Sequence, residues 1–573
     1  MSPPGRPKGE YRSAQHEGTP VSVQRRRVLA AAAALPFAGC GRRPEPSAYT
    51  GGWVGANAER GHRLREAAGK GGLPASEVQR RASVIVVGAG VSGLAAARRL
   101  TQRGIDDVQV FDLEDAAGGN SRGHRIAGMA CPLGAHYLPL PGEQAVEVLE
   151  LLEAVGLRRT EAGRPVYDER HLCHSPQERL NIGGQWHEGL LPPVDALPAE
   201  QRAETLRQYR EFGAAVDRAS EGGAFSMPTA RCTWSPQLDA LDAVAFAPWL
   251  DAQGLNAPAL RWYLDYCCRD DYGAGAAQVS AWAGLHYFAS RHGFHAPGDD
   301  APERDGVLTW PEGNAWLSRR LAEPLGERLQ LGQVVLRVTE NRADVSVDVW
   351  NARAQRAERW TAASVVLAVP LFIAARLLTS TPPALTQAVA AMRHAPWLVG
   401  NLHLSEALAD RPGAPPSWDN VVYDPGAALP TLGYVDAMHQ STRSIPGPTV
   451  LTTYWALGGN TSAQLTQQRA RLLNEPWSAW AQAVVQELAR VHPDLPSKLK
   501  QVDLMRYGHA MSVPVPGLRS SAALHALAAP QGAARRHVHF AHTDLSAYSV
   551  FEEAMYQGVR AATQVVHGFT PAR

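Results

Sequence analysis

The pattern of apolar residues predicts a strand, a helix and a second strand in the first quarter of the chain. Residues 84–87 are four consecutive apolar residues, which is typical of a strand buried on both faces. Leu94, Ala97 and Leu100 follow at helical spacing, with polar residues left for the outer face. A second apolar run, VQVFD, ends at Asp112. This order favours an α/β fold with a parallel sheet.

Glycines at the end of the first strand predict a dinucleotide site. Gly88, Gly90 and Gly93 form G-x-G-x-x-G, in which the first allows a tight turn, the second a close approach of the backbone to a pyrophosphate, and the third close helix packing. Ala89 lies between the first two and belongs to the same predicted contact. Asp112 comes nineteen residues after Gly93, where an acid can accept hydrogen bonds from ribose hydroxyls.

The N-terminus has the layout of an export signal. Arg25, Arg26 and Arg27 precede an apolar run over residues 28–39, and Cys40 follows. Twelve apolar residues are too few to span a bilayer as a helix. The arginines resemble a twin-arginine signal, and Cys40 a lipobox cysteine, with an ordinary cleaved signal as the alternative. We expect export to the periplasm or cell envelope, with membrane contact only through the signal or a lipid anchor.

Composition narrows the class of ligand. The 573 residues include 56 basic and 55 acidic ones, and no long block of like charge occurs, so nucleic-acid binding is not expected and a small-molecule ligand is. The six cysteines form no C-x-x-C pair, and no metal site is predicted, because His537 and His539 alternate on a strand and His542 falls in a loop. The sequence contains no G-x-S-x-G motif, so nothing in it indicates a serine hydrolase.

Four segments resemble the flavin-containing amine oxidoreductase family. They are Gly118-Gly119-Asn120-Ser121-Arg122, the strand region LQLGQVVLRVTE, the strand ASVVLAVPL, and the closing segment HFAHTDLSAYSVFEEAMYQGVRAA. The resemblance implies FAD as the cofactor. It implies contacts at Gly118, Gly119, Asn120, Arg122, Val335, Asp544, Val550 and Phe551, with Val335 near adenine, Asp544 near the ribityl or pyrophosphate region, and amides near Val550 and Phe551 at the pyrimidine edge.

Two departures from the family pattern affect these contacts. The usual Gly-Gly-Arg reads Gly118-Gly119-Asn120, with the arginine two positions later at Arg122. The closing Phe-Ala-Gly-Glu reads Phe-Ala-His-Thr over residues 540–543, with the acid one step on at Asp544.

The resemblance implies a Rossmann-type FAD-binding domain interleaved with a mixed α+β substrate domain and a helical insertion. Helical patterns dominate residues 145–295, whereas residues 376–515 mix strand-like runs with a helix from about 469 to 491. The predicted boundaries are a signal over 1–40, a tether over 41–80, FAD-binding parts over 81–144, 301–375 and 516–573, a helical insertion over 145–300 and a substrate domain over 376–515.

Candidate catalytic residues lie on the substrate side. Asp271 and Tyr272 are expected in a loop, where an acid beside an aromatic ring can bind a cationic amine. The alternative is that Asp270 or Asp271 caps the next helix or pairs with Arg269. Glu312 follows Trp310-Pro311 and either lines the site or belongs to a turn. Tyr548 is the candidate for one ring of an aromatic pair around the amine, with Ala510 or Met511 at the place of the other.

These residues predict an FAD-dependent oxidoreductase that converts the C–N bond of an amine to an imine by hydride transfer. A carbon–carbon desaturase or isomerase acting on an apolar substrate is one alternative, and a non-catalytic envelope protein is another. The chain has four lysines, none between Lys70 and Lys498. Val399 stands where the resembled oxidases hold a lysine near the flavin, so we expect a dehydrogenase that passes electrons to a quinone or small electron carrier.

Overall fold

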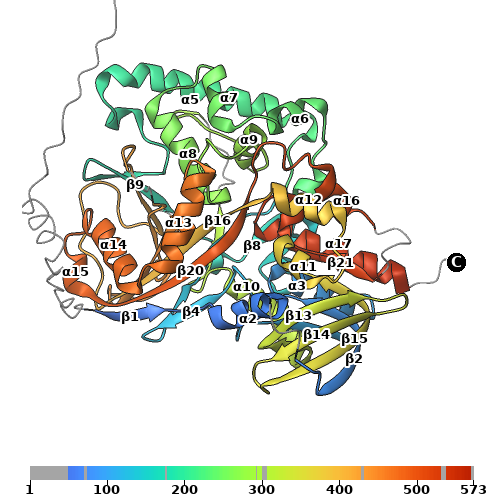
Figure 1. The fold of residues 1–573 in the computed structure, drawn as a ribbon. Helices are drawn as coiled ribbons and strands as arrows, with labels where there is room; N and C mark the ends of the chain where they lie inside the picture. The colour runs from blue at the N-terminus through green and yellow to red at the C-terminus, as the bar shows by residue number, and fades with distance from the viewer. Residues whose placement is uncertain are drawn as a thin grey trace, which may run out of the picture. The chain divides into compact units, whose positions relative to one another are not determined.

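A seven-stranded sheet carries the glycines of the predicted dinucleotide site (Figure 1). The computed structural model describes residues 49–69, 74–174, 177–291, 293–299, 306–427, 431–530 and 537–569. The strand order is β12-β3-β2-β15-β14-β13, with β21 paired to β15. Strands β12, β3, β2, β15 and β21 pair in parallel, whereas β14 pairs antiparallel with β13 and β15. The predicted α/β fold is therefore confirmed.

The strands of this sheet are β2 (Val78–Val87), β3 (Val108–Asp112), β12 (Leu329–Leu331), β13 (Gln333–Glu340), β14 (Val345–Asn351), β15 (Arg356–Leu367) and β21 (Val538–Phe540).

Helices cover both faces of this sheet, which explains the continuous apolar run in β2. Val84 and Val86 pack in one apolar cluster with residues of helices α3 (Val91–Gln102) and α17 (Phe551–Phe569). Ile85 and Val87 pack in a second cluster with residues of α11 (Leu371–Leu377), α12 (Pro383–Ala391) and α16 (Ala522–Ala528). Because alternate residues of a strand point to opposite faces, both faces need apolar side chains.

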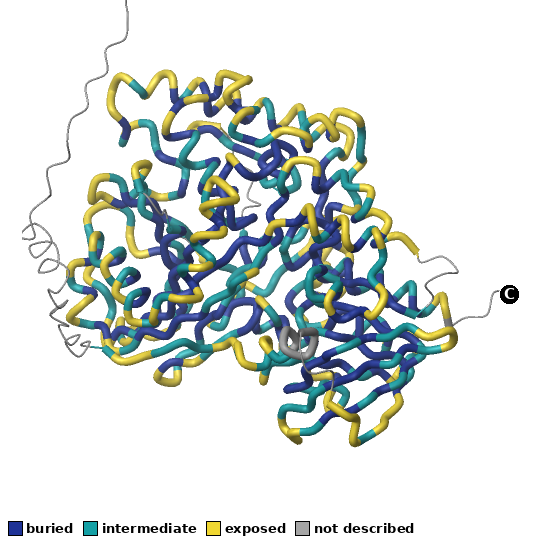
Figure 2. The backbone as a smooth tube through the Cα atoms, in the orientation of Figure 1, coloured by how far each residue is buried: buried dark blue, intermediate teal, exposed yellow. Residues whose placement is uncertain are grey.

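An eight-stranded sheet forms the other half of the described fold, in the order β1-β20-β16-β19-β18-β17-β9-β10. Its strands are β1 (Thr50–Trp53), β9 (Glu178–Ile182), β10 (Gln185–Glu188), β16 (Arg393–Leu404), β17 (Asp419–Val422), β18 (Tyr434–Asp436), β19 (Thr449–Ala456) and β20 (Leu499–Val513). Figure 2 shows buried backbone along both sheets and exposed outer surfaces on the helices around them.

The helices of the predicted insertion are α5 (Ala199–Ser220), α6 (Pro236–Asp242), α7 (Phe246–Ala252), α8 (Pro258–Tyr272) and α9 (Ala281–Ala289). Strands occur in the same stretch, because β9 pairs in parallel with β17 and so joins the eight-stranded sheet. The insertion is therefore less purely helical than its pattern predicts. The partner of β9 lies more than two hundred residues later in the chain, and β9 itself is too short to show a clear periodic pattern, so the local sequence does not indicate this strand.

Two further predictions about segments are wrong in detail. Residues 50–53 do not belong to a tether, because they form β1, which pairs in parallel with β20; α2 (Ala58–Gly69) is the one short helix that the tether prediction allowed. The helix predicted from about 469 to 491 is two helices, α13 (Ser462–Asn474) and α14 (Trp477–Ala489), separated at Pro476. A proline in that place has no amide hydrogen to continue a helix, so the break follows from the sequence.

The chain divides into residues 1–48 and residues 49–573 as separate units. The predicted export signal and Cys40 belong to the first and lie outside the described residues. Among the described residues, no helix combines the length and apolar character needed to cross a membrane. In the same part of the chain, no group of three or more histidine, cysteine or acidic side chains could hold a metal ion.

Candidate functional site

A cavity lined by residues of both sheets contains most of the predicted cofactor contacts. Its wall begins at the glycine loop after β2 and reaches β16, β19 and β20 of the second sheet. Eight predicted cofactor residues line it: Gly88, Gly90, Asp112, Gly118, Gly119, Asn120, Val550 and Phe551. Segments at opposite ends of the chain therefore share one site.

Each glycine of the loop is required for a different physical reason. Gly88 has a φ of +100°, which side chains rarely adopt. A Cβ on Gly93 would lie 1.8 Å from the carbonyl oxygen of Gly88, so helix α3 can approach the strand only with glycine there. Gly90 has an ordinary φ of −71°, and the nearest atom to a Cβ would be the Gly119 Cα at 3.9 Å. The protein leaves this space open, and the open space suits the close approach of a pyrophosphate.

Asp112 is fixed at the end of β3 by two backbone amides. The Ala89 amide donates to one carboxylate oxygen at 2.8 Å, and the Glu114 amide donates to the other at 2.9 Å. Burial raises the pKa of Asp112. Ala89 thus acts through its backbone by positioning the acid, which lines the cavity where a ribose would lie.

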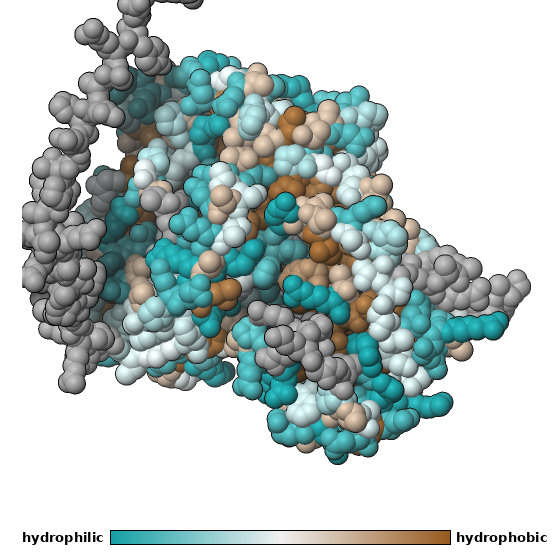
Figure 3. All heavy atoms as spheres, viewed as in Figure 1, coloured by the Kyte–Doolittle hydropathy of each residue, from teal (hydrophilic) through white to brown (hydrophobic). Residues whose placement is uncertain are grey.

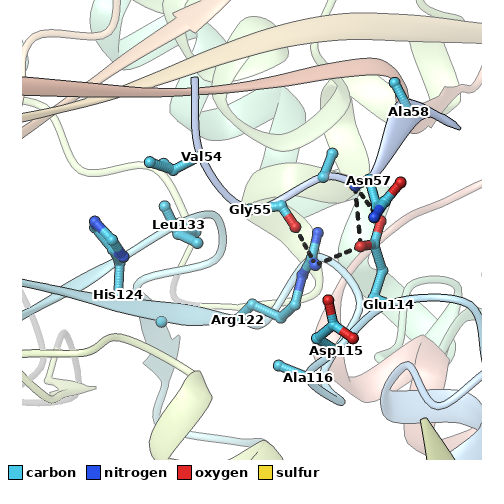
Figure 4. Close-up of a pocket in the computed structure, with 12 residues that line it drawn as sticks. Val54, Gly55, Asn57, Ala58, Glu114, Asp115, Ala116, Arg122, His124 and Leu133 are labelled. Atoms are coloured by element: carbon cyan, nitrogen blue, oxygen red, sulfur yellow. Dashed lines mark hydrogen bonds and ion pairs between the residues drawn. The ribbon is translucent and has the colours of Figure 1, made fainter. Parts of the chain in front are cut away.

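Arg122 lies outside the cavity, contrary to the prediction from the resemblance. Figure 4 shows its guanidinium turned toward the segment that enters α2, where Nη1 donates to the Gly55 carbonyl at 2.8 Å. It lies 3.7 Å from Glu114, whose carboxylate also accepts from the Asn57 amide. The arginine holds the segment before α2 against the loop after β3. Arg122 stands two positions after Asn120, which occupies the place of the family arginine, and its side chain therefore points in a different direction.

Asp544 differs from its predicted role, whereas the backbone contact to adenine implied at Val335 stays a prediction. Val335 packs in the apolar cluster around β2, and its side chain does not line the cavity. The Asp544 carboxylate accepts from the Leu371 amide at 2.8 Å and pairs with His394 Nε2 at 3.0 Å. Protein donors therefore occupy this acid, while the two residues before it, His542 and Thr543, line the cavity instead.

The four predicted catalytic residues fall in different places. Asp271 lines the cavity and is held by Arg291 through two hydrogen bonds of 2.8 and 3.0 Å. The Tyr548 hydroxyl donates to the same carboxylate from outside the cavity lining. Tyr272 points away and donates to the Ala283 carbonyl at 2.7 Å.

Glu312 also lies outside the cavity, where it forms an ion pair with Arg319. The turn alternative weighed for Glu312 fits its position better than the active-site one.

Asp270 is the acid that the sequence reasoning undervalued. It lies near the C-terminal end of α8, which ends at Gly273 in the left-handed conformation, and not in a loop. Its carboxylate lines the cavity and accepts from the Tyr137 hydroxyl at 3.0 Å. Burial, followed by the neighbouring Asp271, raises the pKa of Asp270 to about 7. Side chains of consecutive helical residues differ in direction by about 100°, so predicting a helix here would have indicated that Asp270 and Asp271 have different surroundings.

Aromatic rings form the wall around this acid. His136 and Tyr454 stack with ring centres 4.3 Å apart, and Tyr137 meets Trp418 edge to face at 5.8 Å. Trp397, Tyr507 and His509 line the cavity from the second sheet. At the place expected for one ring of the aromatic pair, Ala510 and Met511 line the cavity, whereas Tyr548, the candidate for the other ring, does not. The rings come from strands far apart in the chain, which is why no local motif indicates them.

The segment expected to carry an oxidase lysine lies on β16. Val399 lines the cavity at the position predicted for that lysine. Of the two lysines in the described ranges, Lys498 donates to the Ala407 carbonyl at 2.6 Å and pairs with Asp494, and neither lines the cavity.

Comparisons with known proteins identify the family of the chain. The model of the family described as flavin containing amine oxidoreductase matches residues 91–566. The "Putative flavin-containing monoamine oxidase AofH" of Mycobacterium tuberculosis is 26% identical over 297 residues, which cover 50% of this chain and 56% of that protein. The L-amino acid dehydrogenase of Synechocystis is 23% identical over 299 residues, 52% of this chain and 58% of that protein. The chain thus spans little more than half the length of these curated relatives.

A solved structure shares the fold. Cyclohexylamine oxidase from Brevibacterium oxydans IH-35A superposes with a TM-score of 0.60 at 18% identity, covering 85% of this chain and 99% of that one. The family is flavin-containing, and the cavity fits FAD: Gly90 would leave room for a pyrophosphate, Asp112 could accept hydrogen bonds from a ribose, and the first turn of α17 offers backbone amides that have no partner within the helix. FAD is therefore the cofactor of this site.

Proposed function

Because this chain belongs to the flavin-containing amine oxidoreductase family, we propose that it is an FAD-dependent oxidoreductase that oxidises the C–N bond of an amine. The observation that carries the proposal is the half-buried Asp270 carboxylate in the same cavity as the dinucleotide-binding glycines. FAD supplies the hydride acceptor. The amine loses a hydride and a proton to become an imine, which water then hydrolyses.

Asp270 has the properties of the group that binds the substrate ammonium and takes up its proton. Its pKa of about 7 lets it exchange a proton near neutral pH, and the Tyr137 hydroxyl fixes one of its oxygens. A neutral amine is the form that can release a hydride. The stacked His136 and Tyr454 rings provide a wall that excludes water and offers a π face to a cation.

The charges in the cavity support an amine over an apolar substrate. Glu552 lines the cavity as well, and burial raises its pKa to about 7. Burying two carboxyl groups beside an alkene would cost free energy without return, whereas a cation offsets that cost. Asp271 contributes less, since Arg291 already neutralises it.

Anaerobic titration of the purified holoenzyme with amines tests the proposal by bleaching of the flavin. We expect Asp270→Asn to retain FAD and to lose most of its rate of reduction by amines. Glu312→Gln is the matched control, because it removes a carboxylate outside the cavity and should reduce at the unaltered rate. Equal rates for Asp270→Asn and the unaltered enzyme would refute the role of Asp270.

Export and the electron acceptor belong to the same proposal. The residues around Arg25–Arg27 and Cys40 support export to the cell envelope, and cell fractionation of Cys40→Ser beside the unaltered protein tests lipid anchoring. Val399 in place of a lysine supports a dehydrogenase that uses a quinone or small carrier.

A further inference from the structure

A second, smaller pocket lies between helices α11, α12 and α13 and strand β20. Phe372, Met392 and Leu465 provide apolar surface, and Arg376 and Arg469 provide positive charge. Figure 3 shows brown and teal atoms close together on this face, between the positions of α12 and α13. The pocket therefore offers apolar contact and cationic groups in the same small space.

The positive charge of this pocket has no acid in the pocket lining, although the lining residue His394 pairs with Asp544 at 3.0 Å. Its lining contains Arg376, Arg393 and Arg469 and no aspartate or glutamate. Arg469 donates to the carbonyl oxygens of Gly508, at 2.8 Å, and of His394. Burial lowers the pKa of Arg469, and no carboxylate in the pocket lining offsets its desolvation. Within the described residues, Arg376 stacks over Phe372 at 5.9 Å and forms no ion pair. An anionic or electron-rich ligand would supply the missing partner.

One side chain connects this pocket to the flavin cavity. His509 lines both spaces, and its ring centre lies 4.8 Å from that of Phe372. The next residues of β20, Ala510 and Met511, line the flavin cavity, and the Asn120 side-chain amide donates to the Ala510 carbonyl at 2.7 Å. A ligand in the small pocket and one in the flavin cavity would thus both contact His509.

We propose that this pocket, here called the acceptor pocket, binds the quinone that reoxidises the flavin. The inference rests on the proposed function, because it assigns a place to the electron acceptor. Two electrons and one proton leave the reduced flavin, and the quinone takes up these and a second proton from water to become a hydroquinone. The apolar residues contact the quinone ring, while the arginines stabilise the negative charge that develops on its oxygens.

Stopped-flow reoxidation of photochemically reduced holoenzyme tests this role without any amine. The probe is dichlorophenolindophenol, a quinone-imine that is anionic at neutral pH. We expect Arg376→Glu and Arg469→Gln to slow reoxidation by the probe about tenfold, because they remove or reverse charge at its site, and to leave reoxidation by oxygen unchanged. Arg342→Glu is the matched control, an exposed arginine on the far sheet, at the turn between β13 and β14.

Unchanged rates in both pocket variants would overturn the proposal, whatever the outcome with amines. A second readout is binding of anthraquinone-2-sulfonate to the oxidised holoenzyme by calorimetry, which we expect Arg376→Glu to weaken about tenfold and Arg342→Glu to leave as it is. Competition by inorganic phosphate as strong as by the sulfonated quinone would show a general anion site and would also overturn the assignment. Loss of amine oxidation with normal probe kinetics would instead count against the proposed function alone.

Discussion

The Asp271 carboxylate and the Arg291 guanidinium form a two-bond ion pair in the wall of the flavin cavity, at 2.8 and 3.0 Å. Arg291 also donates to the Tyr548 oxygen at 2.9 Å. One residue away, Asp270 has the Tyr137 hydroxyl as its hydrogen-bond partner among the described residues and no arginine. Two adjacent acids thus divide their roles, with Asp271 stabilising the wall and Asp270 available to a cation.

We expect Arg291→Met to lower the free energy of unfolding by about 3–5 kcal/mol, since it leaves the Asp271 charge buried without its partner. Thermal unfolding of the holoenzyme measures the effect. The double variant Arg291→Met with Asp271→Leu should recover much of the loss, because it removes both charges together. A change of less than about 1 kcal/mol in Arg291→Met, the range of a surface pair, would show that the ion pair is not desolvated.

Gly90→Val should yield a folded protein without FAD. A Cβ there meets no protein atom closer than the Gly119 Cα at 3.9 Å, so we expect the fold to tolerate a side chain, which would fill the space left for the pyrophosphate. The ratio of flavin to protein absorbance after purification is the measurement. Gly93→Val provides the contrast, because its Cβ would clash with the Gly88 carbonyl at 1.8 Å and impair folding itself. Stoichiometric FAD in Gly90→Val would remove the glycine loop from the cofactor site.

Asp112→Ala should weaken FAD binding by about 1.5–3 kcal/mol, the scale of a lost charge-assisted hydrogen bond. The Ala89 and Glu114 amides also lose their acceptor, which loosens the loop that shapes the site. Titration of the apoprotein with FAD gives the affinity. Glu114→Gln is a close control, since its carboxylate contacts Asn57 and lies outside the cavity. An unchanged affinity in Asp112→Ala would move the ribose contact elsewhere.

Local sequence predicts the part of the site made by neighbouring residues. The glycine loop, the acid at the end of β3 and the start of α17 are each specified within a few residues, and each lies where its pattern indicates. A short motif fixes such features because turn geometry and helix ends depend on adjacent backbone.

The substrate side depends on contacts that no short stretch specifies. The partner of Asp271 is Arg291, which follows the C-terminal end of α9 in the chain. The nearby Arg269 pairs instead with Asp265, one helical turn earlier. The direction of Arg122 depends on the segment at Gly55, which the sequence pattern assigned to a tether. Such choices are made by tertiary packing, so sequence reasoning identified residue types without their partners.

The rate of flavin reduction by an amine should rise with pH up to about 7 and then level off. Asp270 carries a proton below its raised pKa of about 7, so the form that accepts the ammonium proton is depleted at lower pH. The limiting rate of bleaching across pH 5–8 is the measurement, and Asp270→Asn should abolish the inflection. Glu552→Gln serves as the control, because Glu552 also has a pKa of about 7. An inflection lost in Glu552→Gln and kept in Asp270→Asn would assign the proton to Glu552.

Reduced flavin in this protein should react more slowly with oxygen than with a quinone. The first step of oxygen reduction develops negative charge, which a nearby cation stabilises. Val399 lines the cavity where the resembled oxidases hold a lysine, and Lys498 is occupied by Ala407 and Asp494. Val399→Lys should therefore speed reoxidation in air-saturated buffer, with Val399→Met as the control for size without charge. Stopped-flow mixing of each reduced form with oxygen and with a soluble benzoquinone measures both rates. Faster reoxidation of the unaltered protein by oxygen than by every quinone tried would contradict the argument from the absent lysine.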